Sequence, residues 1–190
     1  MAGKIVLVTG GTRSGKSTFA ERYAANSGES VVYIATAQIF DKEMDRRVRL
    51  HRERRPAVWQ TLEAPYDAHN AMAKAVAAAS VVLFDCLTLY ISNLLLGPDA
   101  PGQGADRTNY VMDQIEKLLA CARSDKSTVI FVTNEVGMGI VPENALAREY
   151  RDLAGMVNQK VAAAAAEVYL VVSGLAIEIK KLAVPLGKEG

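Results

Sequence analysis

Residues 4–17 read KIVLVTGGTRSGKS, which is an apolar run, then a glycine-rich turn, then the start of a helical pattern. The last eight of these residues fit the pattern GxxxxGK(S/T) without a mismatch. In such a loop, backbone N–H groups surround phosphate oxygens, glycines permit the tight path, and the following helix points its positive end at the anion. The stretch therefore predicts a phosphate-binding loop between a buried strand and a helix.

Two side chains of this loop are expected to take a direct part in chemistry. Lys16 should reach the β- and γ-phosphates of a nucleoside triphosphate, and the Ser17 hydroxyl should ligate Mg²⁺. A chance match would arise in roughly 1 in 150 chains of this length, but this match also lies after a strand and before a helix, as the mechanism needs. The residues expected to contact the nucleotide are Gly10, Gly11, Thr12, Arg13, Ser14, Gly15, Lys16 and Ser17.

A triphosphate site of this kind also needs an acidic group at the end of a strand to hold the metal shell. Asp85 closes the apolar run SVVLFD at residues 80–85, so we interpret it as a metal ligand. The alternative is that Asp85 only caps the turn after the strand. Serine and aspartate supply hard oxygen ligands, which favour Mg²⁺ over zinc.

The rest of the chain repeats the alternation of apolar runs and helical patterns. Further strands are predicted at 31–35, 80–85, 129–133 and 168–173, and helices at 16–25, 41–55, 67–79, 109–123 and 142–166. The strands are apolar on both faces, as in a parallel sheet that helices cover on both sides. The pattern predicts an α/β protein with a mostly parallel sheet flanked by helices, in which Pro142 opens the last long helix.

The chain closes with a different pattern. Gly174 separates the last apolar run from AIEIK at residues 176–180, which predicts an antiparallel hairpin at the edge of the sheet. We expect one domain over residues 1–181, with residues 97–105 as a surface loop and residues 182–190 as a mobile tail.

Composition excludes several classes of protein. A length of 190 residues suits one domain, and a net charge of +1 gives no argument for nucleic acid as a partner. The two cysteines, Cys86 and Cys121, form no CxxC pair, so neither a disulfide framework nor a cysteine zinc site is expected. No apolar run approaches the ~18 residues of a membrane span, and no signal peptide is visible, so we expect a cytoplasmic protein.

The predicted helix at 41–55 is strongly basic. It carries the six arginines 46, 47, 49, 52, 54 and 55, with His51 among them. His51 shares a helical face with Met44 and Val48, so it should point inward between Arg47 and Arg55. An imidazole placed between two guanidinium groups is harder to protonate and can act as a nucleophile. The alternatives are a structural histidine on a solvated basic face, or a weak nucleic-acid patch.

Residues 134–142, NEVGMGIVP, follow the strand predicted at 129–133. A polar pair at the carboxyl end of a strand, followed by glycines, is where open α/β sheets place ligand contacts. A simple glycine turn that leads into the helix explains the same pattern, and the residues do not decide between the two.

These segments, taken in order, resemble one known family. GGTRSGKS, YIATAQIFDKEMDRRVRLHRERRP, DCLTLYISNLL, NEVGMGIVPENALAREYRDLAGMVNQKVA and VYLVVSG closely resemble the bifunctional adenosylcobinamide kinase / adenosylcobinamide-phosphate guanylyltransferases of cobalamin biosynthesis. The likeness covers about residues 4–180. It implies a RecA-like P-loop fold and two reactions: phosphorylation of adenosylcobinamide by ATP or GTP, and transfer of GMP from GTP through a guanylylated histidine to the product.

The resemblance also implies roles for residues. His51 matches the guanylylated histidine and Lys16 remains the catalytic lysine of the loop. Beyond the loop, the nucleotide contacts carried over from the family are Ala35, Thr36, Ala37, Arg52, Glu53, Arg54, Arg55, Glu63 and Asp85. The expected cofactors are GTP, ATP and Mg²⁺, with Ser17 and Asp85 as the metal ligands.

The expected partners are adenosylcobinamide and its phosphate, and other copies of the chain, with a trimer favoured. Neither nucleic acid nor a membrane is expected as a partner. Two rival functions are a P-loop kinase of another small metabolite and a RecA-like, nucleotide-dependent DNA-binding switch. Only the arginine run supports the second.

Overall fold

The computed structural model describes residues 3–39, 41–102, 104–123 and 126–184, without the side chains of Arg47 and Arg54. Within these residues the strands are β1 (Lys4–Gly10), β2 (Val31–Ala35), β3 (Gln60–Glu63), β4 (Val81–Asp85), β5 (Thr128–Asn134), β6 (Glu167–Val172) and β7 (Leu175–Glu178). The helices are α1 (Lys16–Ser27), α2 (Lys42–Arg54), α3 (Ala68–Ala78), α4 (Leu87–Leu96), α5 (Ala105–Ala122) and α6 (Ala145–Ala164), followed by a short 3-10 turn at Ile179–Lys181.

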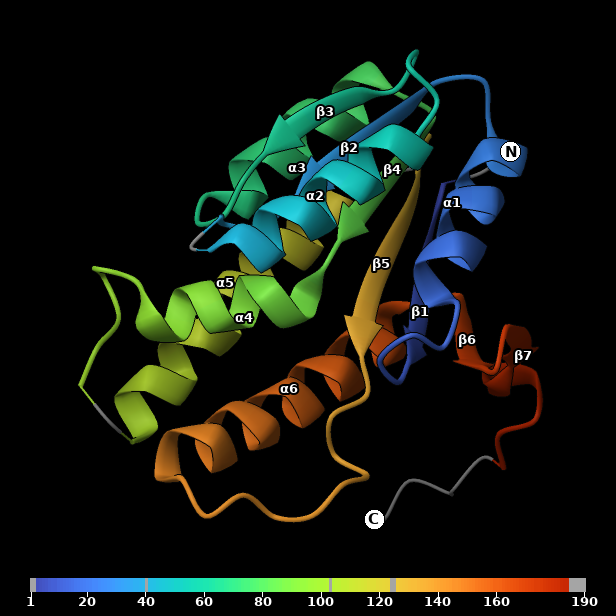
Figure 1. Ribbon diagram of the computed structural model, residues 1–190. Coiled ribbons are helices and arrows are strands. Elements are labelled where there is room, and N and C mark those ends of the chain that lie inside the picture. The colour runs from blue at the N-terminus through green and yellow to red at the C-terminus, as the bar shows by residue number, and fades with distance from the viewer. Residues whose placement is uncertain (1–2, 40, 103, 124–125, 185–190) are drawn as a thin grey trace.

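The described strands form one sheet in the order β3-β2-β4-β5-β1-β6-β7 (Figure 1). Strands β1 to β6 pair in parallel, and β7 returns antiparallel to β6. The α/β fold with a closing edge hairpin is therefore confirmed. Parallel neighbours end at the same edge of a sheet, so the carboxyl ends of β1, β2, β4 and β5 share the edge at which nucleotides bind in open α/β folds.

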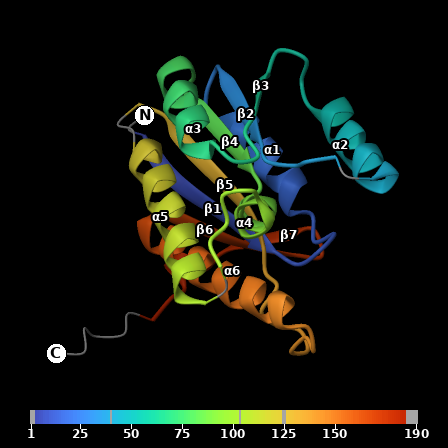
Figure 2. The same ribbon diagram turned by 90° about the vertical axis from the view of Figure 1, so that its left-hand side faces the viewer.

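Alternate residues of each central strand serve two different cores. On β1, Val6 and Val8 pack with Ala20 and Ala24 of α1, whereas Leu7 belongs to the core on the opposite face. That second, larger core is built by α3, α4, α5 and α6. Figure 2 shows α1 and α2 on one side of the sheet and α3 and α5 on the other. Burial on both faces explains why these strands read as continuous apolar runs.

Two elements were not predicted, and the starts of two helices were wrong, since α5 already begins at Ala105 rather than at residue 109. Strand β3 is short, exposed and polar, so it carries no alternation to recognise. Helix α4 is buried almost all round, so it lacks the 3.6-residue stripe of a surface helix. Helix α6 begins at Ala145 rather than at Pro142, because the side chain of Asn144 caps it by accepting the N–H of Ala147 at 3.0 Å.

The predicted surface loop at 97–105 ends one residue early, and the predicted tail is described only as far as Val184. Residues 97–104 connect α4 to α5, as the predicted surface loop does, but Ala105 already belongs to α5. Leu182 and Val184 are exposed beyond the last turn of helix. Residues 185–190 of the expected mobile tail lie outside the described residues.

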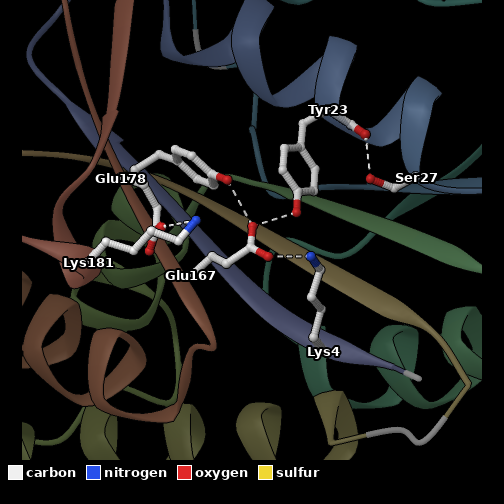
Figure 3. Close-up of polar contacts among 7 residues, drawn as sticks. Lys4, Tyr23, Ser27, Glu167, Glu178 and Lys181 are labelled. Carbon is white, nitrogen blue, oxygen red and sulfur yellow. Dashed lines mark hydrogen bonds and ion pairs between the residues drawn. The ribbon is translucent and has the colours of Figure 1, made fainter. Parts of the chain in front are cut away.

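The half-buried carboxylate of Glu167 connects β1, α1 and β6 at the end of the sheet opposite the phosphate loop (Figure 3). Glu167 accepts hydrogen bonds from the hydroxyls of Tyr23 at 2.6 Å and Tyr169 at 2.9 Å, and forms an ion pair with Lys4. Burial alone would raise the pKa of Glu167, but the hydrogen bonds from Lys4, Tyr23 and Tyr169 outweigh it and lower that pKa below its ordinary value of 4.5. The charged carboxylate therefore stabilises the folded state.

We expect Glu167→Gln to lower the free energy of unfolding at pH 7 by about 1–3 kcal/mol, because Lys4 loses its charged partner. The folded-state pKa is depressed, so the stabilisation is complete above pH 4.5 and disappears as the pH falls below that value. Urea unfolding of both proteins at several pH values should show the difference shrinking in acid. Glu116→Gln, which removes an exposed partner of Lys160, is the control and should cost less than about 1 kcal/mol. A difference that does not change with pH would contradict this account.

Candidate active site

The phosphate loop joins β1 to α1 and is held by the turn between β6 and β7. The N–H of Gly174 donates to the carbonyl of Ser14 at 2.8 Å, and the N–H of Ser14 donates to the carbonyl of Gly11 at 3.2 Å. A Cβ atom at Gly10 would lie 2.4 Å from the carbonyl oxygen of Val171, so no larger residue fits there. Gly15 has φ +98°, in the left-handed region that favours glycine. The loop path thus requires two of its three glycines.

Lys16 and Ser17 open helix α1 at the inner side of this loop. The ammonium of Lys16 donates to the carbonyl of Gly11 at 3.2 Å. Burial lowers the pKa of Lys16, and electrostatic interactions with Cys86 and Asp85 oppose that shift. Ser17 lies half-buried in the first turn of the helix, whereas Thr12 and Arg13 are exposed on the outer side of the loop. The loop therefore brings a cation and a hydroxyl to the positive end of a helix.

Asp85 ends β4 next to this lysine. Its Oδ2 atom accepts the hydroxyl of Tyr33 at 2.7 Å, which fixes the orientation of a largely buried carboxylate. The pKa of Tyr33 is raised well above its ordinary value, first by burial and then by the charge of Asp85. Asp85 and Ser17 offer hard oxygen atoms from two adjacent elements, so the donor set fits Mg²⁺ completed by phosphate and water oxygens. Within the described residues there is no cluster of three or more His, Cys, Asp or Glu side chains suited to a metal ion.

The segment after β2 ties the ends of β2 and β4 together. Thr36 is fully buried, and its hydroxyl donates to the carbonyl of Cys86 at 2.9 Å while accepting the N–H of Cys86 at 2.9 Å. Asn93 of α4 donates to the carbonyl of Thr36 at 2.8 Å. Ala35 and Ala37 lie half-buried on either side. Thr36 thus positions Asp85 from within the protein, and Asn93 is a supporting residue that no sequence pattern indicated.

His51 approaches the site from α2, a helix with no fully buried side chain among those described. As expected, it lies on the half-buried face with Met44 and Val48. Its Nδ1 atom is 4.0 Å from Oδ2 of Asp85 and 4.0 Å from Oε1 of Glu21. Glu21 was not predicted as part of the site. Its position four residues after Ser17, on the same face of α1, is the signal that could have found it.

The sequence predicted that His51 lies between the guanidinium groups of Arg47 and Arg55. The structure does not place Arg55 beside His51. Arg55 caps α2 in an extended conformation, so the helical spacing from His51 no longer applies to it. Its guanidinium carbon lies 3.2 Å from the centre of the Tyr33 ring. The side chain of Arg47 lies outside the described part. The charged groups found beside the imidazole are therefore the carboxylates Glu21 and Asp85.

The remaining predicted contacts lie at the outer end of α2. Arg52 forms an ion pair with Glu63 at the end of β3, which attaches the helix to the sheet edge. Glu53 faces solvent, with its Oε1 atom 4.0 Å from Nε of Arg49. The side chain of Arg54 is outside the described residues. Lys16, Ser17, Asp85 and His51 thus come together, whereas Arg52, Glu53 and Glu63 form a separate, exposed group.

A further segment reaches the phosphate loop from β5. The N–H of Glu135 donates to the carbonyl of Gly10 at 3.1 Å, so the chain after β5 leaves the sheet beside the loop. Asn134 ends β5. Its backbone N–H donates to the hydroxyl oxygen of Thr88 at 2.8 Å, and its buried Oδ1 atom has no hydrogen-bond partner. The segment 134–142 therefore borders the site, as the ligand interpretation of that pattern requires.

Comparisons with known proteins agree with this arrangement. The family described as "Cobinamide kinase / cobinamide phosphate guanyltransferase" matches residues 6–179. The "Bifunctional adenosylcobalamin biosynthesis protein CobU" of Salmonella typhimurium is 45% identical over 181 residues, covering 93% of this chain and 99% of that protein. The protein of the same name from Escherichia coli is 44% identical with the same coverage. The corresponding protein CobP of Pseudomonas aeruginosa is 44% identical over 174 residues, covering 92% of this chain and 96% of its own.

Among solved structures, an ATPase from the type III secretion system of pathogenic bacteria superposes with a TM-score of 0.61 and 14% identity. The match covers 97% of this chain and 59% of that one, and it confirms the predicted α/β fold with a mostly parallel sheet flanked by helices. No helix in the described ranges has the length and apolar character to span a bilayer. Because the family match extends over nearly the whole chain and the relatives are matched almost end to end, the chain belongs to the cobinamide kinase / cobinamide phosphate guanyltransferase family.

Proposed function

We propose that this enzyme phosphorylates adenosylcobinamide with ATP or GTP, and then transfers GMP from GTP to the resulting phosphate through a guanylylated His51. Family membership supports the kinase and guanylyltransferase activities of cobalamin biosynthesis. The observation that carries the assignment of residues is the convergence of Lys16, Asp85 and His51 from three elements. Since both reactions consume nucleoside triphosphates, we further infer that the enzyme works in the cytoplasm.

In the kinase step the phosphate loop holds the triphosphate and exposes its γ-phosphorus to the substrate hydroxyl. Lys16 lies where it can neutralise charge that builds up on the transferred group, and backbone N–H groups of the loop hold the β-phosphate. Ser17 and Asp85 would hold Mg²⁺, which supplies further charge neutralisation when it is bound. The oxygen–phosphorus bond to the acceptor forms as the bond between the γ-phosphorus and the bridging oxygen breaks.

In the guanylyl step an imidazole nitrogen of His51 attacks the α-phosphorus of GTP. A phosphorus–nitrogen bond forms, the bond from the α-phosphorus to the bridging oxygen breaks, and pyrophosphate leaves. A phosphate oxygen of adenosylcobinamide phosphate, the corrinoid substrate, then attacks the same phosphorus and releases the histidine. One difficult transfer thus becomes two easier ones. Nδ1 of His51 lies 4.0 Å from a carboxylate oxygen of Glu21 and 4.0 Å from one of Asp85. Because α2 has no fully buried described side chain, it can adjust over the phosphates without breaking a core.

The other predicted nucleotide contacts fall into two groups. Ala35 and Ala37 flank Thr36 at the same sheet edge, and Arg52, Glu53, Arg54, Arg55 and Glu63 belong to the basic helix and the strand it is attached to. Guanidinium groups bind phosphate oxygens in a bidentate manner, so the arginines are suited to hold the triphosphate during the guanylyl step.

We expect His51→Ala to abolish covalent labelling by GTP labelled at the α-phosphate, while the kinase reaction keeps most of its rate. Lys16→Ala should abolish both reactions, because both need the triphosphate in the loop. Peptide mapping should place the adduct on His51, and the bond should be labile in acid and stable in alkali, as a phosphoramidate is. His69→Ala, which removes the other histidine of the chain, is the matched control. Equal loss of both activities in His51→Ala would contradict the assignment.

Asp85→Asn keeps the size of the side chain and removes the charge that would hold Mg²⁺. We expect the rates of both reactions to fall by about a hundredfold or more, and chelation of divalent cations to stop them in the unmodified enzyme. Asp113→Asn on the exposed face of α5 should leave both rates unchanged. Full activity in a chelator would show that this carboxylate has another role.

We further propose that the chain forms a homo-oligomer, with a trimer favoured. Strand β7 ends the sheet, and its exposed side chains include Leu175 and Ile177. An apolar edge strand is prone to pair with another chain unless it is covered. Light scattering should give the mass of three chains, and Leu175→Lys with Ile177→Lys should give a smaller particle. A monomeric unmodified protein would refute this assembly.

A further inference from the structure

Residues 135–144 connect β5 to α6, and this connection, here named the apolar loop, presents hydrophobic side chains to solvent. The exposed fractions are 82% for Met138, 96% for Ile140 and 63% for Val141. Soluble proteins rarely gather large apolar side chains in water without a binding partner for them. Neither the phosphate chemistry nor the histidine chemistry described above uses these three residues.

Polar contacts hold the apolar loop in place at both ends. At its start, the N–H of Gly137 donates to the Glu135 carboxylate at 2.7 Å, and Arg151 of α6 donates to the carbonyl of Gly137. At its end, Arg148 donates to the carbonyls of Pro142 at 3.0 Å and Glu143 at 2.6 Å. The exposed tips are therefore carried by a fixed backbone. Pre-organised apolar surface of this kind lowers the ordering cost of binding.

The apolar loop lies beside the phosphates that the enzyme must use. Gly10 pairs with Asn134 in the register of β1 and β5, and the N–H of Glu135 donates to the carbonyl of Gly10. In Figure 1 the connection from β5 to α6 runs beneath the turn between β1 and α1. Helix α2, with His51, approaches from the side of α1 and β4. A substrate that meets the triphosphate at the phosphate loop can thus lie along the apolar loop without displacing α2.

Cobinamide, the substrate that accepts the phosphoryl group, has an apolar surface that suits the apolar loop. Cobinamide carries its acceptor hydroxyl on an arm of a corrin macrocycle, whose broad faces are apolar and whose rim bears amide groups. We propose that Met138, Ile140 and Val141 form the surface on which one face of this macrocycle lies. Gly139 gives the rim amides room to approach the backbone of the apolar loop, because nothing lies within 4 Å of a Cβ built at Gly139. The proposal rests on the family's cobinamide chemistry, and it concerns binding alone.

A second copy of the chain is the competing occupant of this surface. The exposed apolar side chains of β7 offer such a copy a separate surface with a strand edge to pair with, which the apolar loop lacks. The apolar loop instead adjoins Gly10 of the phosphate loop. Because of these positions, we assign the apolar loop to the corrinoid substrate and the exposed face of β7 to a second copy of the chain.

The test is the double variant Met138→Ser with Ile140→Ser, assayed in the kinase reaction. The KM for adenosylcobinamide should rise by about tenfold or more, as expected when two apolar side chains lose their contacts. The KM for the nucleotide should stay within about twofold, and so should the rate of His51 labelling by GTP in the absence of corrinoid. Val58→Ser, which removes a side chain that is 90% exposed between α2 and β3, is the matched control.

Three results would overturn the proposal: an unchanged KM for adenosylcobinamide, a smaller particle in light scattering, or a loss of labelling together with the rise in KM. The second would assign the apolar loop to contacts between copies, and the third to nucleotide binding or folding. If the unmodified enzyme formed no adduct on His51, the histidine mechanism would be wrong. The kinase KM would still decide whether the apolar loop binds the corrinoid.

Discussion

The hydrogen-bond register of the parallel strands is the constraint on which the site depends. Gly10 pairs with Asn134 across β1 and β5, and Asp85 pairs with Val132 across β4 and β5, so three strand ends reach one edge within two residues of each other. That alignment places the phosphate loop, the carboxylate for the metal and the start of the apolar loop side by side. A shift of one residue in any of these pairs would turn the side chains of that strand to the opposite face.

The parts of the site are held with different strength. Asp85 is fixed by Tyr33 and, through the backbone, by Thr36, which is itself buried against Asn93. His51 is carried by a helix that is attached through an exposed ion pair and a half-buried face. This division suits an enzyme with two reactions at one triphosphate, because the groups that hold phosphates must stay fixed while the nucleophile has to meet one phosphorus and then release it.

Much of the fold followed from short-range patterns. The central strands were predicted within one or two residues, since burial on both faces leaves a continuous apolar run. Burial almost all round also hides α4, which therefore shows no helical stripe. Strand β3 is too exposed to show a pattern. Asn144 rather than Pro142 marks the start of α6, because a side chain that accepts the N–H of Ala147 satisfies a helix end that proline cannot.

The sequence by itself determined the phosphate loop, with its lysine and serine, because that function depends on backbone geometry that eight consecutive residues encode. It also determined that His51 would face inward, because helical periodicity is local. Only the tertiary structure decided that Glu21 and Asp85 surround the imidazole, that Arg55 instead covers the ring of Tyr33, and that the apolar loop borders Gly10. These contacts join residues far apart in the chain, and strand order and register, which no local pattern contains, bring them together.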